Sequence, residues 1–146
     1  MTMKLALSKF RPLSLILLIG ILNSQLFAQS ANEQSPIDGV SFRFIESNGI
    51  TLRIAEMGES GPLLLLAHGW PESWYSWRHQ IVSLANAGYR VVAPDMRGFG
   101  ESEAPPNVDD YDVMHTSADL VGILDALEEE TAVLVGHDWG AIVAWQ

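Results

Sequence analysis

The chain has 146 residues, of which 48% are apolar, and a formal net charge of −10. This apolar fraction is large enough for a hydrophobic core, so the composition predicts a folded domain rather than a disordered chain. The acidic balance argues against nucleic acid as a partner, because phosphate binding requires a basic face. The sequence has no cysteine, which excludes disulfides, thiolate metal sites and a cysteine nucleophile.

The N-terminus has the three-part layout of a secretory signal peptide. Lys4, Lys9 and Arg11 make a positive start, and a mostly apolar run over 13–22 leads to Ala28. The run is shorter than the roughly 20 residues that cross a bilayer. We therefore predict a signal peptide, a secreted or periplasmic protein, and no stable membrane span once the peptide is removed. An uncleaved membrane anchor is the alternative.

The predicted boundaries follow from this layout and from the composition beyond it. The signal peptide occupies residues 1–28. Residues 29–38 are mostly polar and end in a turn signal, so we interpret them as a linker. The remaining segment, 39–146, is the predicted domain.

Two stretches with alternating apolar residues open this domain, at 40–46 and 50–57. Alternation with a period of two predicts strands that are buried on one face. Asn48-Gly49, the strongest short hairpin signal, lies between them. The domain is therefore predicted to begin with an antiparallel hairpin.

Beyond the hairpin, continuous apolar runs alternate with segments of helical spacing. The runs predict strands buried on both faces, and Asp112 is a candidate N-cap for the second helix. The predicted strands are 63–67, 90–93 and 132–135, the predicted helices are 74–87 and 113–127, and a third helix begins at Ala141. The order predicts an α/β sheet with an antiparallel hairpin at one edge and parallel strands beyond it. Its last strand would be an open apolar edge.

The sequence Gly-His-Asp-Trp-Gly at 136–140 lies between the last strand and the last helix. Glycines on either side of a central nucleophile allow the tight turn of a nucleophile elbow, which leaves the central side chain exposed. Here that side chain is Asp138, a carboxylate that needs no base for activation and suits attack on carbon with formation of an ester. The alternative is an ordinary helix N-cap, a position that aspartate favours.

The sequence His-Gly-Trp-Pro at 68–71 follows the first buried strand. A loop in this place supplies one N–H of an oxyanion hole, and the residue after the nucleophile supplies the other. This assigns the backbone N–H groups of Trp70 and Trp139, whose side chains are also candidates for an apolar pocket. A plain strand-to-helix turn is the alternative, and the helical spacing of Trp74 and Trp77 favours core packing for those two.

A third segment, Asp-Met-Arg-Gly-Phe-Gly-Glu-Ser at 95–102, completes a pattern. Together the three segments resemble the α/β-hydrolase superfamily over about residues 38–146, and most of all its epoxide hydrolase branch. The resemblance implies that Asp138 opens an epoxide to an ester, which a histidine oriented by a second carboxylate then hydrolyses to a diol. It also implies lid tyrosines that support the epoxide oxygen, and no metal or organic cofactor. Asp95 and Arg97 are expected to hold their loop in shape.

In that family the lid, the orienting acid and the base histidine follow the elbow, whereas eight residues follow Asp138 here. We therefore expect the N-terminal part of an α/β-hydrolase fold, truncated after its nucleophile elbow. If such a chain reacts with a substrate at all, we expect a single alkylation of Asp138. The candidate substrates are small apolar epoxides or halides. Haloalkane dehalogenase, with a halide held by the Trp139 indole, is the near alternative, and a catalytically inactive fragment is the alternative of another class. For the histidines we expect structural or surface roles: His68, His79, His115 and His137.

Overall fold

The computed structural model describes residues 35–146; the predicted signal peptide and most of the predicted linker lie outside these residues. No helix in the described part is long and apolar enough to cross a membrane. The strands are β1 (Ser41–Ser47), β2 (Ile50–Met57), β3 (Leu63–Ala67), β4 (Arg90–Pro94) and β5 (Val133–Gly136). The helices are α2 (Arg78–Asn86), α3 (Val113–Ala126) and α4 (Trp139–Trp145), with short 3-10 helices η1 (Trp74–Trp77) and η2 (Val108–Tyr111).

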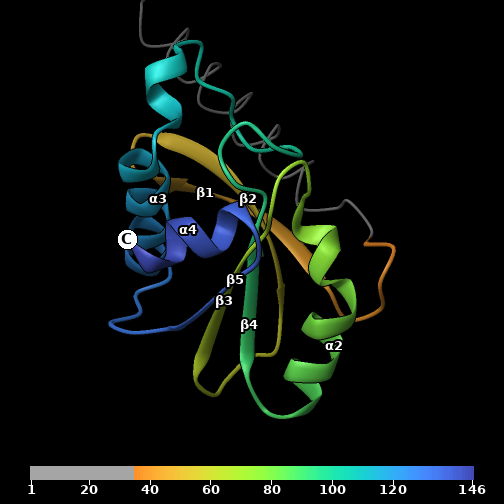
Figure 1. Cartoon of the computed structure of the whole chain (residues 1–146). Coiled ribbons are helices and arrows are strands. Elements are labelled where there is room, and N and C mark those ends of the chain that lie inside the picture. The colour runs from red at the N-terminus through yellow and green to blue at the C-terminus, as the bar shows by residue number, and fades with distance from the viewer. Residues whose placement is uncertain (1–34) are drawn as a thin grey trace, which may run out of the picture. The chain divides into compact units, whose positions relative to one another are not determined.

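The five strands form one mixed sheet in the order β1-β2-β4-β3-β5 (Figure 1). β1 pairs antiparallel with β2 around the Asn48-Gly49 turn, and β2 pairs antiparallel with β4. β3 pairs parallel with both β4 and β5. The predicted α/β sheet, with its antiparallel hairpin at one edge, is confirmed.

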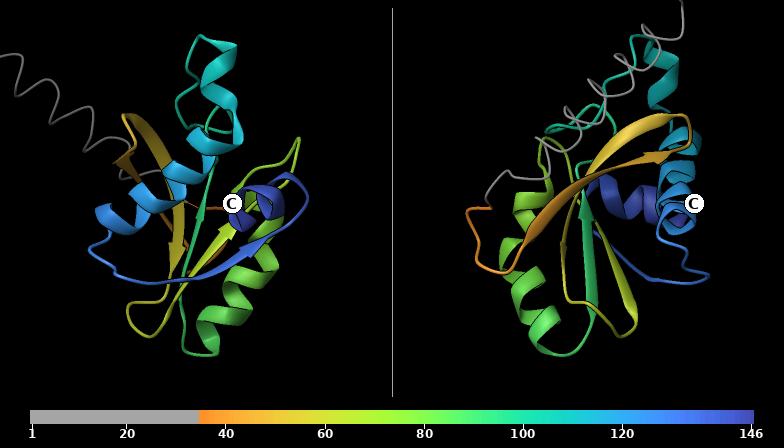
Figure 2. Two further views of the ribbon diagram at one scale, coloured as in Figure 1. Left: turned by 60° about the vertical axis from the view of Figure 1, so that its left-hand side comes forward. Right: turned by 180° about the vertical axis from the view of Figure 1, so that it is seen from behind.

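Helices cover both faces of the sheet, α2 on one side and α3 with α4 on the other (Figure 2). The side chains of β3 divide accordingly, since neighbours along a strand point to opposite faces. Leu64 and Leu66 join the apolar cluster that contains Ile81 of α2. Leu63 and Leu65 join the cluster that contains Ile123 of α3 and Val143 of α4. The continuous apolar run of β3 therefore contributes side chains to the hydrophobic clusters on both faces of the sheet.

The predicted helix over 74–87 is divided into η1 and α2. The Ser73 side chain accepts a hydrogen bond from the Tyr75 N–H, and the Trp74 N–H donates to Asp95 Oδ1 at 2.9 Å. The Trp74 ring is buried against Phe42, with ring centroids 4.9 Å apart. These contacts attach the first turn to the loop after β4. That turn is a tight 3-10 helix, and the α-helix begins only after Trp77. Core packing of Trp74 is confirmed.

Two other predictions about the C-terminal half need correction. The third helix begins at Trp139 rather than Ala141, because the Asp138 carbonyl already accepts the N–H of Ala141 at 3.1 Å. The last strand is not buried on both faces, since Val133 is 54% exposed. Among the described residues β5 pairs with β3 alone, so it forms the open apolar edge that the pattern also predicted. Asp112 does cap α3, accepting the N–H of His115 at 2.8 Å.

Candidate active site

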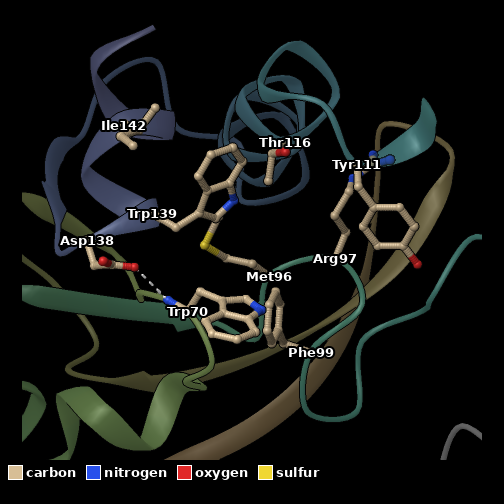
Figure 3. A pocket seen from close by; sticks show the side chains of 9 residues that line it. All are labelled: Trp70, Met96, Arg97, Phe99, Tyr111, Thr116, Asp138, Trp139 and Ile142. Atoms are coloured by element: carbon tan, nitrogen blue, oxygen red, sulfur yellow. Dashed lines mark hydrogen bonds between the residues drawn. The ribbon is translucent and has the colours of Figure 1, made fainter. Parts of the chain in front are cut away.

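The two loops predicted to carry the chemistry meet at one edge of the sheet. β3 and β5 are adjacent and parallel, with Ala67 opposite Gly136, so their carboxyl ends lie side by side. The loop after β3 begins with His68, and the elbow follows Gly136. Ligands bind outside the carboxyl ends of such strands in open α/β sheets. This strand pairing brings Trp70 to Asp138 across 68 residues of sequence (Figure 3).

The elbow has the sharp backbone that its glycines suggested. Asp138 has φ 52° and ψ −121°, a region that side-chain-bearing residues rarely occupy. A Cβ at Gly136 would lie 2.5 Å from the Ala141 Cα, and one at Gly140 would lie 2.2 Å from the Ala67 carbonyl oxygen. Both glycines are therefore required by close approach of the backbone, which leaves Asp138 exposed on the turn.

Asp138 occupies the cap position of α4, but its side chain makes no capping hydrogen bond. Its Oδ1 accepts the backbone N–H of Trp70 at 2.9 Å instead. This bond and, after it, the N–H of Trp139 hold the pKa of Asp138 below its ordinary value, because both stabilise the charged form. Both predicted N–H donors therefore stabilise the charged form of one carboxylate, and that of Trp70 does so through a hydrogen bond of 2.9 Å.

A cavity of about 400 Å³ opens beside this carboxylate (Figure 3). Trp70 and Trp139 both line it, so the structure places the two predicted pocket residues where the sequence suggested. The rest of the wall comes from three other parts of the chain: Met96, Arg97 and Phe99 from the loop after β4, Tyr111 and Thr116 from the η2–α3 segment, and Ile142 from α4. Pockets of this size and mostly apolar wall commonly hold small molecules.

Residues 62–146 match the family model described as alpha/beta hydrolase fold. The chain belongs to the α/β-hydrolase family. It is 56% identical to epoxide hydrolase A of Mycobacterium tuberculosis over 104 residues, which are 70% of this chain and 32% of that relative. It is 54% identical over 101 residues to epoxide hydrolase 2 of Siraitia grosvenorii, covering 69% of this chain and 32% of the relative. These similarities place it with the epoxide hydrolase branch of the family.

Solved structures give the same result. The crystal structure of an epoxide hydrolase from Vigna radiata aligns with a TM-score of 0.73 and 49% identity, covering 77% of this chain and 34% of that one. Epoxide hydrolase A from Mycobacterium thermoresistibile aligns with a TM-score of 0.71 and 54% identity, covering 73% and 34%. The chain therefore spans about a third of the length of the relatives it matches.

In this α/β-hydrolase chain, the loop after β4 is fixed by buried charged groups, as expected for Asp95 and Arg97. Asp95 is fully buried and accepts the N–H groups of Trp74 and Glu101. The Arg97 guanidinium forms a two-point pair with Asp119 of α3, both N···O distances being 2.6 Å. This pairing raises the pKa of Arg97. Asp119 holds Arg97 in place, and no local motif predicted this role because Asp119 lies 22 residues from its partner.

The four histidines lie in the described part, and none there has a hydrogen bond to Asp138. His68 is buried in the loop after β3, and His79 lies on the exposed side of α2. His115 contacts the capping carboxylate of Asp112. The exposed His137 has its Nδ1 3.5 Å from Glu72 Oε2, so its ring is directed to the neighbouring loop. The structural or surface roles predicted for these side chains agree with their positions.

Glu72 is a further residue of this site to which no sequence motif assigned a role. Its Oε2 accepts the N–H of Gly69 at 3.1 Å, and this bond is the main reason that its pKa is lowered. Because Glu72 also lies beside His137, it joins the loop after β3 to the elbow. Within residues 35–146, no three histidine, aspartate or glutamate side chains cluster as a metal site would require.

Proposed function

We propose that this chain carries the nucleophilic part of an epoxide hydrolase, with Asp138 as the nucleophile. The observation that carries the proposal is an exposed, ionised carboxylate that two backbone N–H groups hold at the mouth of an apolar cavity. Such a carboxylate attacks carbon without a base, and an apolar wall suits an uncharged substrate. The names of the relatives support the epoxide as that substrate.

The first step forms one bond and breaks one. Oδ2 of Asp138 attacks a ring carbon, the ring C–O bond breaks, and its electron pair goes to the ring oxygen. This oxygen takes a proton from a donor or from water, which leaves a 2-hydroxyalkyl ester on Asp138. Oδ1 stays against the N–H of Trp70 and becomes the ester carbonyl oxygen.

In the second step water attacks that carbonyl carbon. A base takes one proton from the water, and the negative charge that forms on Oδ1 is stabilised by the N–H groups of Trp70 and Trp139. Collapse expels the diol oxygen, which takes that proton, and the acid left on Asp138 loses its proton to solvent, which balances the proton taken up in the first step. This step requires a base, and within residues 35–146 no histidine is hydrogen-bonded to Asp138. We therefore propose that the 146-residue polypeptide is alkylated once and retains the ester.

The test is the intact mass of the purified chain after incubation with styrene oxide. We expect one adduct with the mass of the epoxide, located on Asp138 by peptide mapping. Asp138→Asn should remain unmodified, whereas Asp125→Asn, which changes an exposed carboxylate of α3, should be modified as the wild type is. Equal modification of Asp138→Asn would refute the nucleophile, and sustained diol production would refute the single reaction.

The alternative substrate is a small haloalkane. The observation in its favour is that the indoles of Trp70 and Trp139 both line the cavity beside Asp138, where their N–H groups could hold a leaving halide. A bromoalkane would then alkylate Asp138 and release one bromide per chain. If styrene oxide modifies Asp138 and the bromoalkane does not, the epoxide is the substrate.

We also propose that residues 1–28 direct export and are removed after Ala28, on the strength of the sequence pattern alone. The measurement is the N-terminal sequence of the protein recovered from a bacterial host expressing the full chain. A mature chain that starts at Gln29 supports the proposal, and a chain that keeps its N-terminus in the membrane fraction indicates the uncleaved anchor.

A further inference from the structure

The peptide unit between Gly69 and Trp70 is hydrogen-bonded at both ends. Its N–H, that of Trp70, donates to Asp138 Oδ1 at 2.9 Å. Its carbonyl, that of Gly69, accepts the N–H of Glu72 at 3.0 Å and lies 2.8 Å from Nδ1 of His68. A peptide unit is planar and its C=O and N–H point in opposite directions. Groups that hold the carbonyl of Gly69 therefore also set the direction of the N–H that faces Asp138.

The hydrogen bonds of His68 fix its tautomer. Nε2 lies 3.0 Å from the backbone nitrogen of Met96, and a backbone N–H can only donate. Nε2 must therefore accept and carry no proton, so the neutral imidazole carries its proton on Nδ1. Nδ1–H then donates to the Gly69 carbonyl, which can only accept. Burial lowers the pKa of His68, which favours this neutral form.

His68 also joins the oxyanion loop to the wall of the cavity. Its ring is fully buried and packs edge-to-face on Phe99, with centroids 5.2 Å apart. Phe99 and Met96 both line the cavity. The imidazole therefore has one hydrogen-bond partner in the loop after β3 and one in the loop after β4, and neither partner is a reacting atom.

We propose that His68 is a positioning residue: as its Nδ1–H tautomer it holds and polarises the Gly69–Trp70 peptide, so that the Trp70 N–H is presented to Asp138 and to the oxyanion that forms there. This inference rests on the proposed function for its chemical consequence. The physical basis is cooperativity, since a hydrogen bond accepted by a carbonyl strengthens the N–H of the same peptide as a donor.

Two substitutions separate this role from simple packing. In His68→Asn the amide nitrogen can take the place of Nδ1 and donate to Gly69, while the bond to Met96 is lost. In His68→Gln the longer side chain can bring an amide oxygen to the place of Nε2 and accept from Met96, while the bond to Gly69 is lost. Each variant removes one hydrogen bond, so the two should lose comparable stability in urea unfolding. Only His68→Gln removes the polarising bond.

The chemical readout is cleavage of the Asp138 ester by hydroxylamine. The chain is alkylated with styrene oxide, the excess is removed, and hydroxylamine is added. Its nitrogen attacks the ester carbonyl, negative charge forms on Oδ1, and collapse expels the glycol oxygen, which takes a proton lost from nitrogen. Intact mass follows the conversion to the hydroxamate. We expect His68→Asn to react within about twofold of wild type and His68→Gln roughly fivefold more slowly. Equal slowing of both variants would overturn the proposal.

A second readout does not depend on ester formation. In chain labelled with ¹⁵N-histidine, the nitrogen shifts of His68 near pH 7 should show a protonated Nδ1 and an unprotonated Nε2. The Trp70 amide proton should move upfield in His68→Gln and stay in place in His68→Asn. The opposite tautomer, or identical Trp70 shifts in the two variants, would refute the positioning role. If these shifts behave as expected while wild type forms no ester, the proposed function fails and the positioning of the peptide stands.

Discussion

Gly69→Ala is the substitution that should separate reactivity from stability most clearly. Gly69 is buried between the two loops of the site. A Cβ added there would lie 2.7 Å from the Asp138 Cβ, 3.0 Å from His137 Nδ1 and 3.1 Å from Asp138 Oδ1. Ordinary contact begins at 3.4 Å, so Asp138 must retreat from 2.7 to 3.4 Å, about 0.7 Å.

This retreat acts on the nucleophile, because Asp138 is the exposed and movable partner in the contact. Overpacking of this kind costs about 1–3 kcal/mol of folding stability, because the Cβ of Asp138 is fixed to the backbone and the elbow itself must shift. A displacement of about 0.7 Å at a reacting group should lower the alkylation rate by roughly 10- to 100-fold. The hydrogen bond from Trp70 to Oδ1, 2.9 Å in the present structure, should lengthen as well.

The assay is the pseudo-first-order rate of alkylation by styrene oxide, followed by intact mass, together with urea unfolding. Gly49→Ala is the matched control, because Gly49 lies in the β1–β2 turn with φ +80° and no atom within 4 Å of the added Cβ. Its left-handed backbone should cost about 1–2 kcal/mol without changing the alkylation rate. The reasoning is refuted if Gly69→Ala is alkylated as fast as Gly49→Ala.

Three further predictions concern charged and titrating groups. The N–H groups of Trp70 and Trp139 lower the pKa of Asp138, so the alkylation rate should fall to half its value only below pH 3.8. A rate profile tests this, and a midpoint above 3.8 would contradict it. Burial lowers the pKa of His68, so the unfolded chain binds more protons and the free energy of unfolding should fall as pH drops below 6.5. Urea unfolding at about pH 7.5 and 5.5 tests this, and His68→Asn should lose less stability between them. Asp119→Ala leaves the buried Arg97 guanidinium without its carboxylate and should cost about 3–5 kcal/mol in urea unfolding; a loss below about 1 kcal/mol would show that solvent reaches Arg97.

The parts of the fold that depend on local patterns could be predicted from the sequence. The Asn48-Gly49 turn fixed the hairpin register, in which Ser47 pairs with Ile50. The unbroken apolar run of β3 predicted a strand covered on both faces, and α2 covers one face while α3 and α4 cover the other. The same run pattern over 132–135 was misleading, because hydrophobicity does not tell whether a neighbouring strand is present. Val133 is apolar and yet exposed at the sheet edge.

Some residues of the candidate site could also be predicted from local motifs, and others could not. Two short motifs contain Asp138, Trp70 and Trp139, and the glycines in these motifs indicate tight turns. These three residues could therefore be found without a structure. Tyr111 of η2 and Thr116 of α3 line the cavity because Arg97, in the loop after β4, is hydrogen-bonded to Asp110 and Asp119 of the same segment, and no local pattern records these contacts. The Tyr111 hydroxyl donates to the Pro105 carbonyl at 2.7 Å, so its ring forms a fixed wall.

The glycines of the site explain why two motifs so far apart in sequence occur together. Gly69 and Gly140 do not have the positive φ that would itself demand glycine; each is required by what lies against it. Gly69 faces Asp138, on the other motif, and Gly140 faces the carbonyl of Ala67, at the end of the strand that carries the first motif. The loop after β3 therefore leaves space for the elbow, and the elbow leaves space for the end of β3. Both loops together set the distance from the Trp70 N–H to Asp138 Oδ1. Substitutions in the two loops should consequently be non-additive in alkylation rate, since either one alone already displaces the carboxylate from its donor.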